Sequence, residues 1–201
     1  ANSFGLRHRT GLHECLSPLA QISQTPATLD FPRHRLPANF HAVGPLRRTK
    51  DDTEKRRGAW PIDPARPFVF ASLGTLQGHR YGLFKTIARA CRRLDVQLAI
   101  AHCGGLPPAR AEALKAHGAT FVTDFADQRA TLRQAQAVIT HGGLNTVVDA
   151  IATSTPMLVM PIAFDQPGVA ARLVWHGLGQ RVSRRSGSAR LARALETLLA
   201  D

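Results

Sequence analysis

The chain has 201 residues, of which 44% are hydrophobic and 20% are charged, as is typical of a globular protein. Its formal net charge of +12 indicates an anionic partner, which can be nucleic acid, a membrane surface or a phosphorylated small molecule. Three widely spaced cysteines exclude a disulfide framework and a cysteine zinc site, and no segment reaches the ~20 apolar residues that span a bilayer.

The first part of the chain, residues 1–45, has scattered prolines and little sustained periodicity. We expect one short strand within residues 19–32 and another within residues 39–46, but no complete folding unit. Residues 46–66 are charged and end in the stretch WPIDPARP, which is the composition of a solvated linker. We therefore expect a domain boundary in this linker, with Trp60 as its anchor.

After residue 67 the pattern becomes regular, and short apolar runs alternate with segments of helical periodicity. This alternation predicts an α/β fold, in which a Rossmann-like parallel sheet is covered by helices on both faces. We expect Trp175 to pack one of these helices against the sheet. The predicted strands are residues 68–74, 96–102, 120–125, 137–141, 156–162 and 179–183. The predicted helices are residues 81–94, 128–135, 145–153, 168–177 and 189–200.

The stretch THGGLNTVVDA (residues 140–150) contains the first candidate site, a glycine turn between a predicted strand and a predicted helix. The turn lies at the carboxyl end of the strand, where ligands bind in such sheets. Gly142 and Gly143 allow the backbone to approach a ligand closely. Asn145 and Thr146 fall at the helix start, where capping side chains and unpaired N–H groups favour phosphate.

Two further side chains of this stretch suit a phosphorylated ligand. His141 can donate a hydrogen bond to phosphate oxygens, the more readily when it is protonated. Asp149 lies one to two turns into the helix, where its carboxylate can accept a hydrogen bond from a ribose hydroxyl. An ordinary glycine turn, with its histidine bonded to backbone, explains the same residues equally well. The stretch by itself leaves both interpretations open.

A second turn of the same layout lies in MPIAFDQPGVAA (residues 160–171) and contains Asp165 and Gln166. An adjacent carboxylate and amide can hold vicinal hydroxyl groups, because the first accepts hydrogen bonds and the second both donates and accepts them. The alternative is a capping aspartate followed by a solvent-facing glutamine. Two neighbouring turns, one suited to phosphate and the other to a polyol, indicate a nucleotide-sugar site.

Residues 125–179 resemble the donor-binding signature of the UDP-glycosyltransferases, with its glycines, histidine and Asp–Gln pair in the same order. The resemblance extends over residues 67–201 and is greatest to bacterial members that glycosylate a carotenoid hydroxyl. The segment LPANFHAVGPL (residues 36–46) also resembles the one that precedes the interdomain linker in this family.

The resemblance implies a GT-B fold, in which an N-terminal Rossmann-like domain binds the acceptor and a C-terminal one binds the donor. Residues 1–45 are then the end of the acceptor domain and residues 46–66 are the linker. Residues 67–201 form the donor-binding domain, which we expect to be truncated at its C-terminus. The implied partners are a UDP-sugar donor, a small lipophilic acceptor and the protein's own N-terminal domain.

The resemblance also implies roles for individual residues. Phe125 takes the place of a tryptophan that stacks on uracil, and Gln128 matches the glutamine of the same motif. Asp149 matches a glutamate that binds the ribose hydroxyls. Contacts with the diphosphate are implied for His141, Gly143, Asn145 and Thr146, contacts with the sugar for Asp165 and Gln166, and an approach to both for Ser72, Gly74 and Thr75.

The implied reaction is an inverting, metal-independent transfer of a sugar, with glucose expected, and the UDP-sugar is a co-substrate rather than a cofactor. The chain has no Asp-x-Asp metal motif, and a helix start with His141 can stabilise the departing diphosphate. In the family the catalytic base is a histidine near the start of the N-terminal domain, a region that has no match here. We interpret His8, His13 and His34 as surface residues and expect this chain alone to be inactive.

Two other classes of protein stay open at this point. One is a GT-B transferase with another nucleotide sugar and a lipid-linked acceptor, although the Asp165–Gln166 pair favours the first family. The other is a nucleic-acid-binding protein, but only 6% of residues are aromatic, and basic residues cluster at 47–57 and 181–190 rather than along one helix. We therefore expect no nucleic-acid partner. We expect a cytoplasmic protein whose basic linker also suits peripheral contact with anionic lipid.

Overall fold

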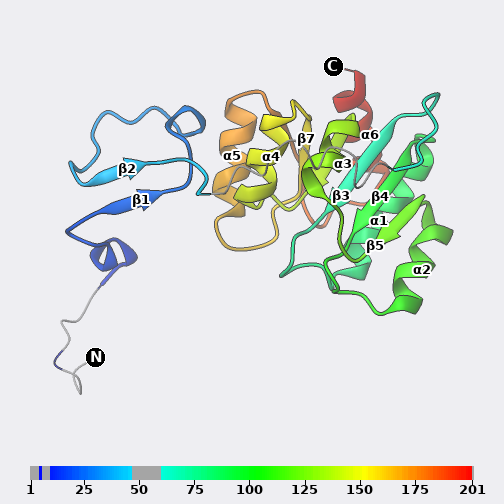
Figure 1. The fold of residues 1–201 in the computed structure, drawn as a ribbon, viewed down its shortest axis with the longest axis horizontal. Helices are drawn as coiled ribbons and strands as arrows, with labels where there is room; N and C mark the ends of the chain where they lie inside the picture. The colour runs from blue at the N-terminus through cyan, green and yellow to red at the C-terminus, as the bar shows by residue number, and fades with distance from the viewer. Residues whose placement is uncertain (1–4, 6–9, 47–59, 201) are drawn as a thin grey trace. The chain divides into compact units, whose positions relative to one another are not determined.

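The computed structural model describes residue 5, residues 10–46 and residues 60–200. The chain divides into two compact units, Ala1–Arg48 and Thr49–Asp201 (Figure 1). Most of the predicted linker, residues 47–59, lies outside the described residues.

The first unit contains a small two-stranded sheet. Strands β1 (Gln21–Ser23) and β2 (Phe40–Ala42) pair in parallel, and each lies within a segment predicted to form a short strand. This confirms both strand predictions. His34 is exposed, as expected, whereas His8 and the side chain of His13 lie outside the described residues. Two 3-10 helices, Leu12–Cys15 and Ala27–Leu29, belong to the same unit.

The second unit is built on a six-stranded sheet in which all neighbouring strands are parallel. The strand order is β5–β4–β3–β6–β7–β8, so the chain first builds outward from β3 and then adds strands on its other side. This confirms the predicted α/β fold with a Rossmann-like sheet. The strands are β3 (Phe68–Ser72), β4 (Gln97–Ala101), β5 (Phe121–Thr123), β6 (Ala137–Thr140), β7 (Met157–Val159) and β8 (Gly179–Arg181).

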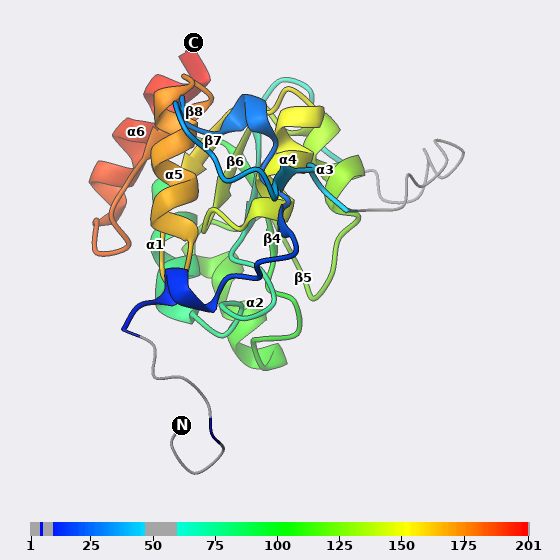
Figure 2. The same ribbon diagram turned by 90° about the vertical axis from the view of Figure 1, so that its left-hand side faces the viewer.

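Helices cover both faces of this sheet, as can be followed in Figures 1 and 2. The helices are α1 (Tyr81–Arg93), α2 (Pro108–His117), α3 (Gln128–Gln134), α4 (Leu144–Ala152), α5 (Gln166–Trp175) and α6 (Ser188–Ala200). α1 packs against α2 and α6 on one face, and α3 packs against α4 on the other. Five of the six lie where the sequence predicts helices. α2 is not predicted, because Leu114 is its only fully buried residue and its apolar stripe is correspondingly weak.

The central strands are buried on both faces. Every residue of β3, β4 and β6 is buried, because alternate side chains point to opposite faces and both faces are covered. On one face Val69 and Ala71 share a hydrophobic core with Phe84, Ile87 and Cys91 of α1. Burial raises the pKa of the Cys91 thiol to about 12, so this cysteine is an inert core residue. Among the described residues, no helix is both long and apolar enough to cross a membrane.

The two tryptophans differ in burial. Trp60 anchors its segment as predicted, because its Nε1 donates to Thr131 Oγ1 at 3.0 Å and its ring centroid lies 5.2 Å from that of Phe121. The prediction that Trp175 packs α5 against the sheet is wrong, since this residue is 64% exposed. Leu173 is fully buried on the same helix, and a residue two positions later lies on the opposite side.

We expect Gly179→Ala to lower the free energy of unfolding by about 1–3 kcal/mol, because overpacking against backbone forces the chain to shift. A Cβ at residue 179 would lie 2.1 Å from the carbonyl oxygen of Met157, its partner in the β7–β8 pair. Gly82→Ala is the control, since a Cβ there meets no atom within 4 Å and alanine favours a helix by about 0.5–1 kcal/mol. Urea denaturation measures both, and an unchanged stability of Gly179→Ala would contradict the prediction.

Candidate functional site

Three neighbouring strands bring most of the predicted site residues together. β3, β6 and β7 are adjacent and parallel, so the loops that follow them lie at the same edge of the sheet. These loops contain residues 72–75, residues 141–146 and residues 165–166. β5 lies at the far end of the strand order, but the helix that follows it, α3, packs against α4 and brings Gln128 to the same region.

The ring of His141 is held between two glycines. A Cβ on Gly74 would lie 2.7 Å from ring atom Cε1, and a Cβ on Gly143 would lie 2.6 Å from Nε2. A larger residue at either position would therefore displace the imidazole. Gly74 also has a φ of +72°, which glycine adopts without strain. Together the two glycines fix where the His141 ring lies.

Helix α4 begins without a side-chain cap. Gly143 is the N-cap residue and has no side chain to offer the first turn. Asn145 and Thr146 lie inside the first turn rather than at the cap, and Thr146 Oγ1 donates to Gln128 Oε1 at 3.0 Å. The N–H groups of a first turn have no helical acceptor, and the helix dipole adds positive potential there. This end of α4 therefore favours an anion.

The environment of His141 favours its neutral form. Burial lowers its pKa from the ordinary value of 6.5, while the Asp165 carboxylate and a hydrogen bond with the Ser72 backbone act in the opposite direction. The effect of burial prevails, so the folded protein favours the uncharged imidazole. A neutral ring still has one N–H to donate.

Gln128 and Asp149 contact each other directly. Gln128 Nε2 donates to Asp149 Oδ2 at 2.6 Å, and Arg129 Nε lies 3.8 Å from Asp149 Oδ1. Asp149 is only 5% exposed. Both carboxylate oxygens thus face residues of α3. The predicted contact of Asp149 with a ribose stays a prediction.

The Asp–Gln pair divides into an exposed and a buried residue. Asp165 is exposed and its side chain makes no capping hydrogen bond, although it occupies the N-cap position of α5. Gln166 is 4% exposed, and its Oε1 accepts from the N–H groups of Ile162 and Ala163, both at 2.8 Å. The alternative interpretation, a capping aspartate with a solvent-facing glutamine, is therefore wrong on both counts. Gln166 holds the loop that presents Asp165.

The other predicted residues also differ in exposure. Ser72 is buried, and its Oγ accepts from the N–H of Gly74 at 3.4 Å, so it shapes the loop after β3. Thr75 is exposed in the same loop. Phe125 is 69% exposed, which leaves its ring available for stacking.

Two further residues lie at this edge that the sequence did not single out. Phe164, directly before Asp165, is 74% exposed and has a φ of +57°, an uncommon conformation for a bulky residue. Arg129 follows Gln128 and approaches the carboxylate of Asp149. Their only signal in the sequence is their position next to a predicted site residue.

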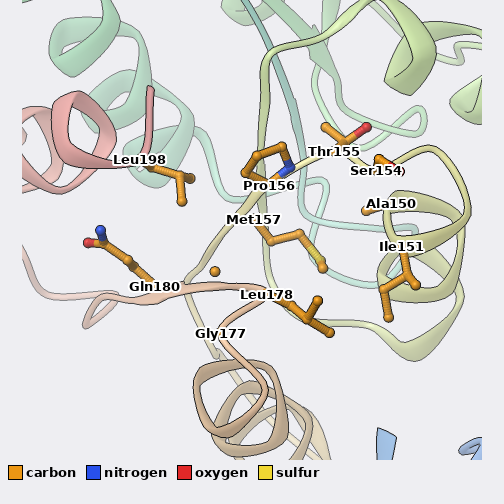
Figure 3. A pocket seen from close by; sticks show the side chains of 11 residues that line it. Ala150, Ile151, Ser154, Thr155, Pro156, Met157, Gly177, Leu178, Gln180 and Leu198 are labelled. Atoms are coloured by element: carbon orange, nitrogen blue, oxygen red, sulfur yellow. The ribbon is translucent and has the colours of Figure 1, made fainter. Parts of the chain in front are cut away.

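A cavity of about 570 Å³ lies at the opposite edge of the sheet (Figure 3). It is lined by Ala150, Ile151, Ser154, Thr155, Pro156, Met157, Gly177, Leu178, Gly179, Gln180 and Leu198. None of these is a predicted site residue. α4, α5 and α6 end at this edge, so the negative ends of their dipoles disfavour a diphosphate there. The edge that contains His141 is therefore the candidate site.

The strand order and the loops at this edge define the fold class, a Rossmann-like parallel sheet of the kind found in solved glycosyltransferases. The solved structure of the calicheamicin glycosyltransferase CalG4 matches 100% of this chain and 50% of its own chain. The TM-score of this match is 0.73 at 23% sequence identity, which establishes the shared fold.

Sequence comparison places the chain in one family. It is 56% identical over 202 residues to the zeaxanthin glucosyltransferase of Pantoea ananas and 54% identical over 201 residues to that of Pseudescherichia vulneris. These alignments include 100% of this chain but 46% and 48% of the relatives, so the chain spans about half the length of the curated relatives it matches. The family model "UDP-glucoronosyl and UDP-glucosyl transferase" matches residues 10–201, and the chain belongs to this family.

We expect His141 to make the stability of the protein depend on pH. Its pKa is lower in the folded than in the unfolded chain, so the unfolded chain binds the proton more readily. Its contribution is fully present above the unfolded value of 6.5 and is lost as the pH falls towards the folded pKa. Urea denaturation gives the free energy of unfolding at about pH 7.5 and at about pH 5.5. From the higher to the lower pH, this free energy should fall more for the unsubstituted chain than for His141→Gln. Equal losses would contradict the assignment.

Proposed function

We propose that this chain supplies the donor-binding domain of a UDP-glycosyltransferase that transfers glucose from UDP-glucose to a hydroxyl of a lipophilic acceptor such as a carotenoid. The observation that carries the proposal is the His141 ring, held between Gly74 and Gly143 beside the uncapped start of α4. This arrangement offers a hydrogen-bond donor and a positive helix end to the same diphosphate. The names of the two zeaxanthin glucosyltransferases support this choice of sugar and acceptor.

In this proposal each part of the donor has its own contacts. The diphosphate lies at the start of α4, facing the first-turn N–H groups and His141. The sugar contacts Asp165, which the loop after β7 exposes at the same edge. The base stacks on the exposed ring of Phe125, and the ribose lies beside Gln128 and Asp149.

The proposed reaction is a single displacement that inverts the configuration of the sugar. The acceptor oxygen attacks the anomeric carbon from the side opposite the diphosphate, and the bond from that carbon to the diphosphate oxygen breaks. UDP leaves with the electron pair of that bond, and the start of α4 and His141 stabilise its charge. The acceptor proton passes to a base that we place in the N-terminal domain. The scheme requires no metal ion.

We further propose that residues 1–45 are the end of the acceptor domain, residues 46–66 the linker and residues 67–201 the donor-binding domain. A two-stranded sheet such as β1–β2 is marginally stable by itself. Leu19 and Ile22 are 87% and 64% exposed in that unit, as apolar residues of a larger domain would be. We place the protein in the cytoplasm, with peripheral contact at the membrane in which a lipophilic acceptor resides.

Donor binding is tested by calorimetric titration with UDP, UDP-glucose and TDP. We expect saturable binding of UDP-glucose and a loss of affinity of about 10- to 100-fold in His141→Ala, because a hydrogen bond to a charged group is removed. His117→Ala removes a half-buried histidine at the end of α2, outside the predicted site residues, and is the control. If folded protein binds none of the three nucleotides even when the N-terminal domain is added in trans, the proposal is wrong.

Turnover is tested separately from binding. We expect the 201-residue chain alone to transfer no glucose from UDP-glucose to zeaxanthin, because the base lies in the N-terminal domain. Chromatography of the carotenoid after incubation measures the transfer. Formation of a zeaxanthin glucoside by the 201-residue chain with no other protein present would show that the base lies in this chain.

A further inference from the structure

His102 is a buried histidine at the meeting point of three loops, and the proposed binding scheme gives it no role. It follows β4 directly and is 2% exposed. Its Nδ1 accepts from the N–H of Leu106 at 3.2 Å, and its Nε2 lies 3.1 Å from Asp124 Oδ1. Its carbonyl oxygen would lie 1.9 Å from a Cβ on Gly78, so the loop after β3 packs against it as well. The imidazole therefore joins the loops that follow β4 and β5, and the backbone of the same residue packs against the loop that follows β3.

The hydrogen bonds of His102 determine its tautomer. Because Nδ1 accepts the Leu106 N–H, the ring proton is on Nε2, and Nε2 donates to the Asp124 carboxylate. This donation needs no charge on the ring. Asp124 is exposed at 66% of its side chain, so it is the end of the pair that faces the surface.

Asp124 is held at two points, and the residue that follows it is Phe125. The backbone oxygen of Asp124 accepts from the N–H of Cys103 at 2.6 Å, while its side chain accepts from His102. In addition, Thr123 Oγ1 donates to the backbone oxygen of Phe125 at 3.1 Å. Hydrogen bonds thus hold the start of the loop after β5 against the residues that follow β4.

The other end of the same loop is fastened to α4. Gln128 donates to Asp149 at 2.6 Å and accepts from Thr146 at 3.0 Å. Between the two fastened ends, the Phe125 ring is 69% exposed. An exposed aromatic ring on a loop held at both ends is arranged to stack on a flat ligand with little further loss of freedom.

We propose that His102 is a positioning residue, which acts through Asp124 to present the ring of Phe125 to the pyrimidine base of a nucleoside diphosphate. The inference rests on the proposed function, since it takes Phe125 as the stacking residue. His102 itself touches no part of the donor. Loosening the His102–Asp124 link lets the loop move, and the ring then loses freedom when it stacks.

A double-mutant cycle with UDP as the ligand tests this. In calorimetric titrations of the 201-residue chain, Phe125→Ala should weaken UDP binding about 5- to 100-fold, the range for loss of base stacking. Asp124→Ala should weaken it about 3- to 10-fold, the range for one hydrogen bond. The double variant should bind UDP no more weakly than Phe125→Ala alone, because Asp124 acts only through that ring.

Two further variants complete the experiment. Asp124→Asn keeps an oxygen that accepts from His102 Nε2 and should restore most of the affinity lost in Asp124→Ala. Glu112→Ala is the matched control, since its carboxylate is 70% exposed and paired with Lys115 on α2, and it should leave UDP affinity unchanged. Thermal denaturation of each variant confirms that it is folded.

The outcomes separate this inference from the proposed function. The inference is overturned if the effects of Asp124→Ala and Phe125→Ala on UDP affinity add in the double variant. It is also overturned if Asp124→Ala leaves UDP affinity unchanged. In both cases UDP binding by the unsubstituted chain still supports the proposed function. An unchanged affinity in Phe125→Ala removes the stacking assignment and this inference with it. Absence of UDP binding by the unsubstituted chain, even with the N-terminal domain added in trans, contradicts both.

Discussion

Parallel pairing of all six strands in the second unit is the constraint on which its other features depend. Each strand must be followed by a crossover before the next can pair with it, and here helices provide the crossovers. Both faces of the sheet are thereby covered, which explains why every residue of β3, β4 and β6 is buried. The same constraint sends the carboxyl ends of all strands, and the starts of the helices that follow, to a single edge. Helix starts, which favour anions, and the loops after the strands gather there as a consequence.

Close approach of backbone at this edge depends on a few glycines. Gly74 and Gly143 leave room for the His141 ring, and Gly78 lies against the carbonyl of His102. A methyl group at any of these positions would overlap its neighbour, so the loops pack at van der Waals distance. The glycines of this region are therefore needed for close packing of the loops, in addition to any contact with a ligand.

Polar side chains at the same edge bond to the protein itself. Gln128 bonds to Asp149 and Thr146, Gln166 accepts two backbone N–H groups, and His102 links two loops. Buried amides and imidazoles with satisfied hydrogen bonds hold loops in one conformation. Exposed groups such as Asp165 and Phe125 are then presented on a fixed frame, and in the proposed function this frame lowers the entropy lost when the donor binds.

The sequence by itself determined the alternation of strands and helices, the glycine turn at His141 and the family. These features follow from local periodicity and short motifs, which can be recognised without the tertiary structure. It did not reveal α2, whose apolar stripe is weak, or the exposed side of α5 that contains Trp175. Nor did it reveal that Gln166 turns inward, or that His102 pairs with Asp124, 22 positions further along the chain. Such contacts follow from which strands become neighbours: β4 lies beside β5, and so the residues just beyond each strand meet. Only the tertiary structure decides that adjacency, because no local pattern of side chains specifies the order of strands in a sheet.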